Sequence, residues 1–324
     1  MSGLREEAAG RSAPAADFLK RAARIALDLL YPPSIYCMAC GNLIDASRPY
    51  SLCDACRERF GWANGDSCAK CGRPLHGGGP QTLCADCAGG GHLFEKGFAC
   101  VEYADCRAVL YGFKYGGRTY YGEHIARVMH DRLLWEGRAQ TEPANGRDAN
   151  GRDADGRAGG PANAPAHGAP RTGERSGRAG EPGTGGLRRL GVDLLLPVPM
   201  YAKKERKRGY NQADIAGRLL ARLLAVPYDG KLLERIRDTH VMSNLSAEER
   251  GANVKGAFAL ARDREDAVRG LRVMLADDIY TTGSTLDACA EALLAAGAAS
   301  VRFIVFAATG AGADAGAGDL RGVM

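Results

Sequence analysis

Residues 273–286 read VMLADDIYTTGSTL. The apolar run Val273–Ala276 predicts a buried strand, and two carboxylates, Asp277 and Asp278, follow it. A turn rich in hydroxyl groups and glycine comes next, and an apolar helical pattern starts behind it. The N–H groups left unpaired at the start of a helix, together with the hydroxyl groups of the turn, form a cradle for an anion. Such a cradle beside two acids suits a sugar phosphate that carries a pyrophosphate and Mg²⁺.

The run LADDIYTTGST at residues 275–285 resembles the phosphoribosyl-pyrophosphate (PRPP) motif of type I phosphoribosyltransferases. The resemblance implies that Asp277 and Asp278 hold the 2′- and 3′-hydroxyls of the ribose and that the turn holds the 5′-phosphate. The alternative is an ordinary strand–turn–helix with a capped helix N-terminus. The implied phosphate-binding residues are Thr281, Thr282, Gly283, Ser284 and Thr285.

Cysteines are the second strong signal, because 11 are many for a chain that we expect in the cytoplasm. Eight of them form four CxxC pairs, a spacing in which a tight turn lets two thiolates face one metal ion. Four pairs therefore predict two structural Cys₄ zinc sites. Neighbouring pairs are the simplest arrangement, a cross-braced one stays open, and disulfides or redox pairs are the disfavoured alternative. The predicted zinc ligands are Cys37, Cys40, Cys53, Cys56, Cys68, Cys71, Cys84 and Cys87.

Strands and helices alternate in the C-terminal half of the chain. Apolar patterns predict strands at residues 192–198, 271–276 and 301–307, and helices at 211–224 and 284–296. This alternation argues for a parallel sheet. We expect an α/β fold with a type I phosphoribosyltransferase-like parallel sheet, helices on both of its faces, and a small zinc-ribbon domain before it. Because the cysteine region has little core of its own, we expect zinc removal to unfold it and to spare the sheet.

Cations gather beside the predicted phosphate site. Pro197–Pro199 ends a strand, the place where ligands bind in open α/β sheets and where phosphoribosyltransferases have their pyrophosphate loop. The basic run Lys203–Arg208 opens a helix directly after it. A charge run is often only a solvated face, but here we expect it to bind anions. Residues 235–258 are polar with scattered cations, which fits either a mobile hood over the pocket or a plain surface loop.

Taken in order, these motifs resemble the ComF family. They are four zinc knuckles, FKYGGR at 113–118, PVP at 197–199, KRGYNQ at 207–212, an Arg-x-x-Asn element and DDIYTTGST. ComF proteins are bacterial proteins tied to DNA uptake in natural competence and to growth on external DNA. The family often carries a glutamine where Met242 stands, so a polar substrate contact at that place is in question. The resemblance implies further pocket residues at Lys114, Arg208, Asn211, Gln212, Arg250 and Asn253.

Composition divides the chain. Residues 137–186 have almost no apolar side chains and predict a disordered insert that the fold tolerates. The amphipathic pattern at residues 17–30 predicts a helix that packs on the main domain or lies on a membrane surface. The expected parts are an N-terminal tail and helix in 1–35, a double zinc ribbon in 36–92, a phosphoribosyltransferase-like domain in 93–136 and 187–309, and a loose tail in 310–324.

The composition also limits the compartment and the partners. No apolar run approaches the ~20 residues of a membrane helix, and the first residues lack the apolar segment of a signal peptide. We therefore expect a cytoplasmic protein, peripheral to the inner membrane face if the N-terminal helix binds lipid. The net charge of +5 permits contact with nucleic acid but does not argue for it.

Two functions fit these residues. The first is an enzyme that binds Mg²⁺–PRPP and transfers its phosphoribosyl group, with Asp277, Asp278 and Arg208 at the reaction centre; its acceptor, a nucleobase or a nucleic-acid end, stays open. The second is a module without turnover, which senses PRPP or another sugar phosphate, or binds single-stranded DNA and a competence helicase. Tyrosines among the cations would stack bases in that case, or simply pack. They are Tyr115, Tyr120, Tyr121 and Tyr210.

Overall fold

The computed structural model describes residues 35–63, 67–75, 82–139, 191–238 and 253–310. The expected N-terminal helix, the C-terminal tail and most of the expected insert lie outside these residues, as do Arg250 and Met242. The insert was placed from residue 137 onward, whereas helix α5 continues to Ala139.

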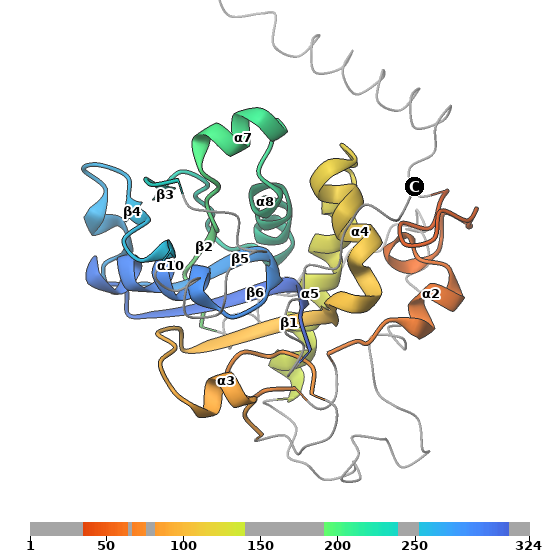
Figure 1. The fold of residues 1–324 in the computed structure, drawn as a ribbon, viewed down its shortest axis with the longest axis horizontal. Helices are drawn as coiled ribbons and strands as arrows, with labels where there is room; N and C mark the ends of the chain where they lie inside the picture. The colour runs from red at the N-terminus through yellow and green to blue at the C-terminus, as the bar shows by residue number, and fades with distance from the viewer. Residues whose placement is uncertain (1–34, 64–66, 76–81, 140–190, 239–252, 311–324) are drawn as a thin grey trace, which may run out of the picture.

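A four-stranded sheet forms the centre of the fold (Figure 1). Its order is β1-β6-β5-β2, and every neighbouring pair is parallel, as the alternation of strands and helices predicts. The strands are β1 (Lys96–Glu102), β6 (Ser300–Ala308), β5 (Arg272–Tyr280) and β2 (Leu194–Pro197).

Strand β5 is longer than the sequence predicts. It does not stop at Ala276, because its pairing with β6 continues to Ile279 and Tyr280, opposite Ala307 and Ala308. The two acids of the motif therefore belong to the last part of a strand rather than to the turn after it. A strand presents successive side chains to opposite faces, so the regular ladder holds the backbone of both acids while separating their side chains.

Helices cover both faces of the sheet, as expected. One face packs on α4 (Tyr103–Tyr115), α5 (Tyr121–Ala139) and α8 (Gln212–Leu224), and the other on α10 (Ser284–Ala295). Strand residues alternate between the two cores: Leu195 and Met274 face the first, whereas Leu196 and Leu275 face the second. A small antiparallel pair, β3 (Leu233–Arg235) and β4 (Phe258–Leu260), lies beside α10.

The basic run forms a helix of its own instead of opening a long one. Helix α7 (Ala202–Arg208) ends at Gly209, which adopts the left-handed conformation with φ of 90°. Helix α8 then starts behind Asn211, whose side chain accepts a hydrogen bond from the Ala213 N–H at 3.1 Å. An asparagine in this place is a strong N-cap, so the chain restarts at a new angle after the glycine.

Eight cysteines form two clusters of neighbouring pairs, which is the simplest of the pairings that the sequence left open. Within each cluster the sulfur atoms all lie within 4.8 Å of one another. The Sγ atoms of Cys40 and Cys53 are 3.8 Å apart, and those of Cys71 and Cys84 are also 3.8 Å apart. That spacing is the edge of a tetrahedron with Zn–S bonds of about 2.3 Å, so both clusters fit a zinc ion.

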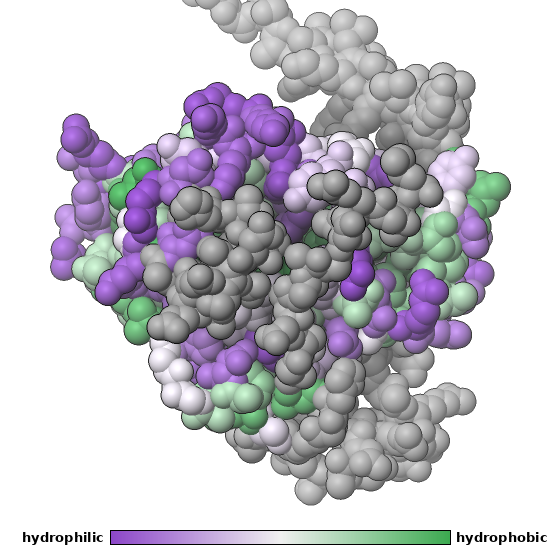
Figure 2. Space-filling model, in the orientation of Figure 1, coloured by the Kyte–Doolittle hydropathy of each residue, from purple (hydrophilic) through white to green (hydrophobic). Residues whose placement is uncertain are grey.

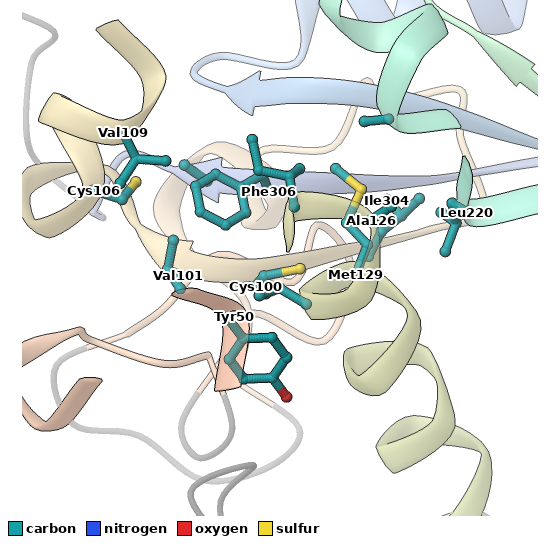
Figure 3. Packing of buried hydrophobic residues seen from close by; sticks show 14 of the residues in the cluster. Tyr50, Cys100, Val101, Cys106, Val109, Ala126, Met129, Leu220, Ile304 and Phe306 are labelled. Atoms are coloured by element: carbon teal, nitrogen blue, oxygen red, sulfur yellow. The ribbon is translucent and has the colours of Figure 1, made fainter. Parts of the chain in front are cut away.

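The two clusters pack against opposite faces of the sheet. Cys37 and Cys56 of the first cluster belong to the core under α4 and α5, whereas Cys68 and Cys71 of the second belong to the core under α10. Tyr50 lies in the sequence between the two cysteine pairs of the first cluster, and Figure 3 shows it beside residues of β1 and α5 in the first core. Of the short helices that belong to the clusters, α2 (Asp54–Arg59) lies beside α4, and α3 (Ala85–Ala88) lies below the sheet in Figure 1.

Backbone hydrogen bonds also tie each cluster to the sheet. The Ala63 N–H donates to the Cys100 carbonyl at 2.9 Å, and the Gly97 N–H of β1 donates to the Lys70 carbonyl at 2.8 Å. Gly72 lies so close to β1 that a Cβ atom there would be 2.5 Å from the Gly97 carbonyl oxygen. The packing therefore argues against a zinc-ribbon domain that unfolds alone while the sheet stays intact.

Removing zinc should destabilise the sheet together with the ribbons. Eight thiolates predict about two zinc ions in freshly purified, reduced protein, and zinc-coupled folding of each ribbon completes one core of the sheet. We expect chelation to lower the melting temperature followed by circular dichroism of the sheet by more than ~5 °C. An unchanged melting transition after complete removal of zinc, measured by elemental analysis, would contradict this coupling.

Candidate functional site

A cavity of about 250 Å³ opens at the carboxyl ends of β2 and β5. This is the position at which open parallel sheets bind their ligands, because the loops that leave neighbouring strands diverge there. The residues that line it are Lys114, Val198, Pro199, Met200, Arg208, Asn211, Gln212, Ala213, Arg235, Asp277, Asp278, Ile279, Tyr280, Thr281, Thr282, Gly283, Ser284, Thr285 and Leu286.

Asp277 and Asp278 form the acidic wall of the cavity together with a lysine. Lys114, at the end of α4, places its Nζ atom 2.9 Å from an Oδ atom of Asp278. Burial alone would lower the pKa of Lys114, but the charge of Asp278, the hydrogen bond to it and the charge of Asp277 together outweigh burial and raise that pKa. Asp278 is thus a paired carboxylate whose negative charge is balanced within the protein.

Asp277 is the unbalanced acid. Its Oδ1 atom accepts a hydrogen bond from the Asp278 N–H at 2.8 Å. Burial, followed by the negative charge of Asp278, raises the pKa of Asp277 to about 7. Asp277 therefore keeps its proton on the acid side of a pH of about 7, and a cation or a hydroxyl donor in the cavity would favour its release.

The turn 281–285 forms the second wall of the cavity. Gly283 has a φ of 82°, which favours glycine, and a Cβ atom there would lie 2.9 Å from both His92 and the Tyr280 hydroxyl. The hydroxyl oxygens of Thr282 and Ser284 are 2.9 Å apart, and helix α10 starts at Ser284. Hydroxyl groups and the first N–H groups of a 12-residue helix thus meet at one point, which suits a phosphate.

The third wall comes from α7 and α8. Arg208 donates from Nη1 to the Gln212 Oε1 atom at 2.7 Å, and its guanidinium lies 5.0 Å from the ring centre of Tyr115. The amide of Asn211 donates to the Val198 carbonyl at 3.1 Å, while its oxygen caps α8. The amide groups of Asn211 and Gln212 are therefore engaged within the protein, which favours a positioning role for both.

Arg235 lines the cavity from β3, and the sequence did not single it out. Its guanidinium lies 5.3 Å from the ring centre of Phe258, and burial lowers its pKa. The sequence shows Arg235 only as one of several cations in a polar segment, and it does not indicate which of them faces the pocket. The register of β3 with β4, opposite Phe258, is what brings it to the site.

Most of the predicted pocket residues that the structure describes meet at this cavity, and one does not. Asn253 does not line it; its carbonyl accepts a hydrogen bond from Arg237 at 3.4 Å. Arg250 lies outside the described residues. Those that meet are Lys114, Arg208, Asn211, Gln212, Asp277, Asp278 and all five residues of 281–285.

The four tyrosines divide into packed and exposed ones. Tyr121 is buried, and the Tyr210 hydroxyl donates to the Phe113 carbonyl at 2.6 Å. Tyr115 and Tyr120 are 60% and 56% exposed. The packing explanation therefore holds for the first two, whereas Tyr115 and Tyr120 offer exposed aromatic surface, and Tyr115 does so beside the cavity residue Arg208.

Among the described helices, none has the length and apolar composition required to cross a bilayer.

Known families match two parts of the chain. A double zinc ribbon domain matches residues 26–88, and a phosphoribosyl transferase domain matches residues 215–320, which contains the acids and the turn. With the geometry of the two Cys₄ clusters, the first match supports two structural zinc ions. The second agrees with the parallel sheet and its covering helices.

Curated relatives match about a third of the chain. Competence protein F of Haemophilus influenzae is 39% identical over 101 residues, which are 31% of this chain and 44% of the relative. The DNA utilization protein YhgH of Escherichia coli K12 is 37% identical over 110 residues, covering 34% and 47%. Competence protein ComFC of Bacillus subtilis is 31% identical over 111 residues, covering 33% and 40%. The chain thus spans less than half the length of these relatives.

The raised pKa of Asp277 predicts how stability depends on pH. In the folded protein Asp277 keeps its proton up to a pH of about 7, whereas in the unfolded chain it loses the proton near ~4. As the pH rises through this window, ionisation of Asp277 therefore lowers the stability of the folded state. Asp277→Asn removes the cost. We expect urea titrations without Mg²⁺ to show a gain that grows from pH 4.5 to about 7 and reaches about 1–2 kcal/mol, reduced from the full shift because the side chain is partly exposed.

Asp278→Asn is the matched control for this prediction. It removes the ion-pair partner of Lys114, a partly buried ammonium group, so it should destabilise the protein at the same pH values. Equal losses of stability in both variants would contradict the assignment of the unbalanced charge to Asp277.

Proposed function

Because the chain belongs to the ComF family, we propose that it binds Mg²⁺–PRPP in the cavity at the ends of β2 and β5 and acts in the uptake or use of external DNA. The observation that carries the proposal is the juxtaposition, in one cavity, of two acids and a phosphate-type turn at a helix N-terminus. The names of the relatives, competence and DNA utilization proteins, support the cellular role. Such a role suits a protein on the cytoplasmic side of the membrane.

Each part of PRPP has a chemically matching group of residues in the cavity. The turn 281–285 offers hydroxyl and N–H donors to the 5′-phosphate. Asp277 and Asp278 offer carboxylate oxygens to the two ribose hydroxyls, and they are the acids among the described cavity residues. Arg208 and Arg235 offer positive charge to the pyrophosphate, for which planar guanidinium groups are well suited.

The same acids suit Mg²⁺. This ion prefers oxygen ligands and commonly binds through one or two carboxylates and the phosphates of its substrate. When bound, it would neutralise part of the pyrophosphate charge. Asp277, which lacks a cationic partner as close as that of Asp278, is the acid better placed to accept it.

Transfer of the phosphoribosyl group would depend on positioning and charge. The bond from the anomeric carbon to pyrophosphate breaks, pyrophosphate leaves with the bonding electrons, and an acceptor nucleophile replaces it. The acids would hold the ribose while the arginines stabilise the leaving group. Among the described residues that line the cavity there is no histidine or cysteine to act as a base. Pyrophosphate release with a nucleobase or a nucleic-acid end tests for turnover.

A module that binds single-stranded DNA without turnover is the second candidate. The rings of Tyr111 and Tyr115 lie 5.3 Å apart and both are exposed, and Arg208 stacks on Tyr115. Figure 2 shows hydrophilic residues gathered over α7, the helix whose last residue is Arg208. Exposed rings beside cations are the elements with which proteins bind single strands. A competence helicase is the partner that this role would imply.

Binding of PRPP should depend on Mg²⁺ and on both acids. We expect calorimetry to show binding by the wild-type protein and at least a tenfold loss in Asp277→Asn/Asp278→Asn, because two charge-assisted contacts of about 1.5–3 kcal/mol each disappear. Asp193→Asn is the control, since Asp193 pairs with Arg272 at the amino end of β5. Wild-type affinity in a folded double variant would defeat the proposed pocket.

Single-stranded DNA should bind weakly and with a strong dependence on salt. If α7 makes three or four phosphate contacts, the logarithm of the affinity should fall with the logarithm of salt concentration with a slope of about −2 to −3. Replacing Lys203, Lys204 and Lys207 with Gln should flatten this slope. A matched triple change of exposed cations elsewhere, Lys231, Arg262 and Arg269 to Gln, should leave it unchanged. The opposite pattern would place the contact surface away from α7.

A further inference from the structure

The two zinc ribbons repeat the same sequence pattern but differ in the residue that follows the glycine of their first knuckle. CMACGNLI at 37–44 aligns with CAKCGRPL at 68–75, and the next knuckle follows at the same distance in both. The local hydrogen bonds also match: each glycine after a knuckle donates to the first cysteine of that knuckle at 2.8 Å. After this glycine, however, the first ribbon has an exposed asparagine, Asn42, and the second has Arg73, which is only 4% exposed.

Arg73 reaches from the second ribbon to the phosphate turn. Its Nη2 atom donates to the Thr281 carbonyl at 2.5 Å and pairs with Asp86 at 3.0 Å. Its guanidinium lies 5.0 Å from the ring centre of Tyr280, the last residue of β5. One buried cation therefore contacts both the helix of the second Cys₄ cluster and the first residue of the 281–285 turn.

A second set of hydrogen bonds joins the chain after the same ribbon to the start of α10. His92 and Leu93 follow the last knuckle, and Asp287 accepts the Leu93 N–H at 2.9 Å and bonds the His92 Nδ1 atom at 2.7 Å. The His92 ring also fills the space beside Gly283. The first ribbon bonds to other elements instead; for example, Tyr50 donates to Asp131 of α5 at 2.7 Å.

Holding the Thr281 carbonyl has a consequence for the next peptide N–H. A trans peptide is planar, and its N–H group points opposite to its carbonyl group. No described peptide bond is cis, so the Thr282 N–H points away from Arg73. Thr281 and Thr282 both line the cavity, and Arg73 does not. Fixing one carbonyl from behind thus orients one donor of the proposed phosphate cradle.

We propose that Arg73 is a positioning residue through which the zinc-loaded second ribbon fixes the 281–285 turn for a 5′-phosphate. A zinc ion held by four thiolates would leave an excess of negative charge in the second ribbon, which favours the guanidinium that pairs with Asp86 there. The claim about ligand affinity rests on the proposed function. The claim about the order of the turn does not.

Arg73→Ala and Arg73→Lys test the proposal, with Asn42→Ala as the control at the equivalent place in the first ribbon. All three proteins should keep two zinc ions by elemental analysis. In Arg73→Ala we expect ribose 5-phosphate to bind at least tenfold more weakly by calorimetry, while Mg²⁺–pyrophosphate binds as in the wild type. Lysine keeps the positive charge but lacks the planar guanidinium with its several N–H donors, so Arg73→Lys should recover part of the lost affinity.

Hydrogen exchange supplies the readout that needs no ligand. In the zinc-loaded Arg73→Ala variant, amides of 282–285 should exchange faster, while amides of β2 should keep their wild-type rates. Unchanged exchange in the turn overturns the proposal. Equal losses for ribose 5-phosphate and pyrophosphate, or loss of zinc from Arg73→Lys, also overturn it, because Arg73 would then only support the fold. If the wild type binds no PRPP, the proposed function fails, and the exchange rates still decide the role of Arg73.

Discussion

Strand β5 pairs with β6 from Arg272 opposite Ser300 to Tyr280 opposite Ala308, and most of the molecule depends on this ladder. Its alternating side chains supply both cores, so each face of the sheet gains its helices and its zinc ribbon from the same register. A slip by one residue would exchange the two faces. The last rungs of the ladder also fix the backbone of the two acids, which gives the cavity a rigid wall.

The cavity brings together groups whose arrangement does not itself stabilise the folded protein. The Asp277 carboxylate is partly buried beside a second acid, and Gly283 has a left-handed backbone conformation within the turn. Lys114 balances only one of the two acids directly. Binding sites commonly keep such destabilising arrangements because the ligand relieves them. The proposed occupant, Mg²⁺–PRPP, would bring positive charge and hydroxyl donors to these acids together.

Sequence reasoning found the parts whose chemistry is local. The DDIYTTGST motif, the four knuckles and the parallel sheet each follow from a short pattern, and the structure assembles them as predicted. It could not find Arg73 or Arg235, because an arginine in a polar stretch carries no sign of the partner that it meets far along the chain. It also ended β5 too early, since only pairing with β6 shows that acids can continue a strand. Conversely, Asn253 matched a motif without reaching the cavity.

The position of β1 has a consequence for how the chain is made. Within the described sheet its neighbouring strand is β6, and the two are the first and the last strand of the described chain. During synthesis the ribbons and β1 therefore leave the ribosome long before the strand that completes their cores. Contacts of such long range form slowly and leave apolar surface uncovered meanwhile. Early capture of zinc would keep the nascent N-terminal segment compact during that wait, and the supply of metal would then govern how much of the newly made protein escapes aggregation.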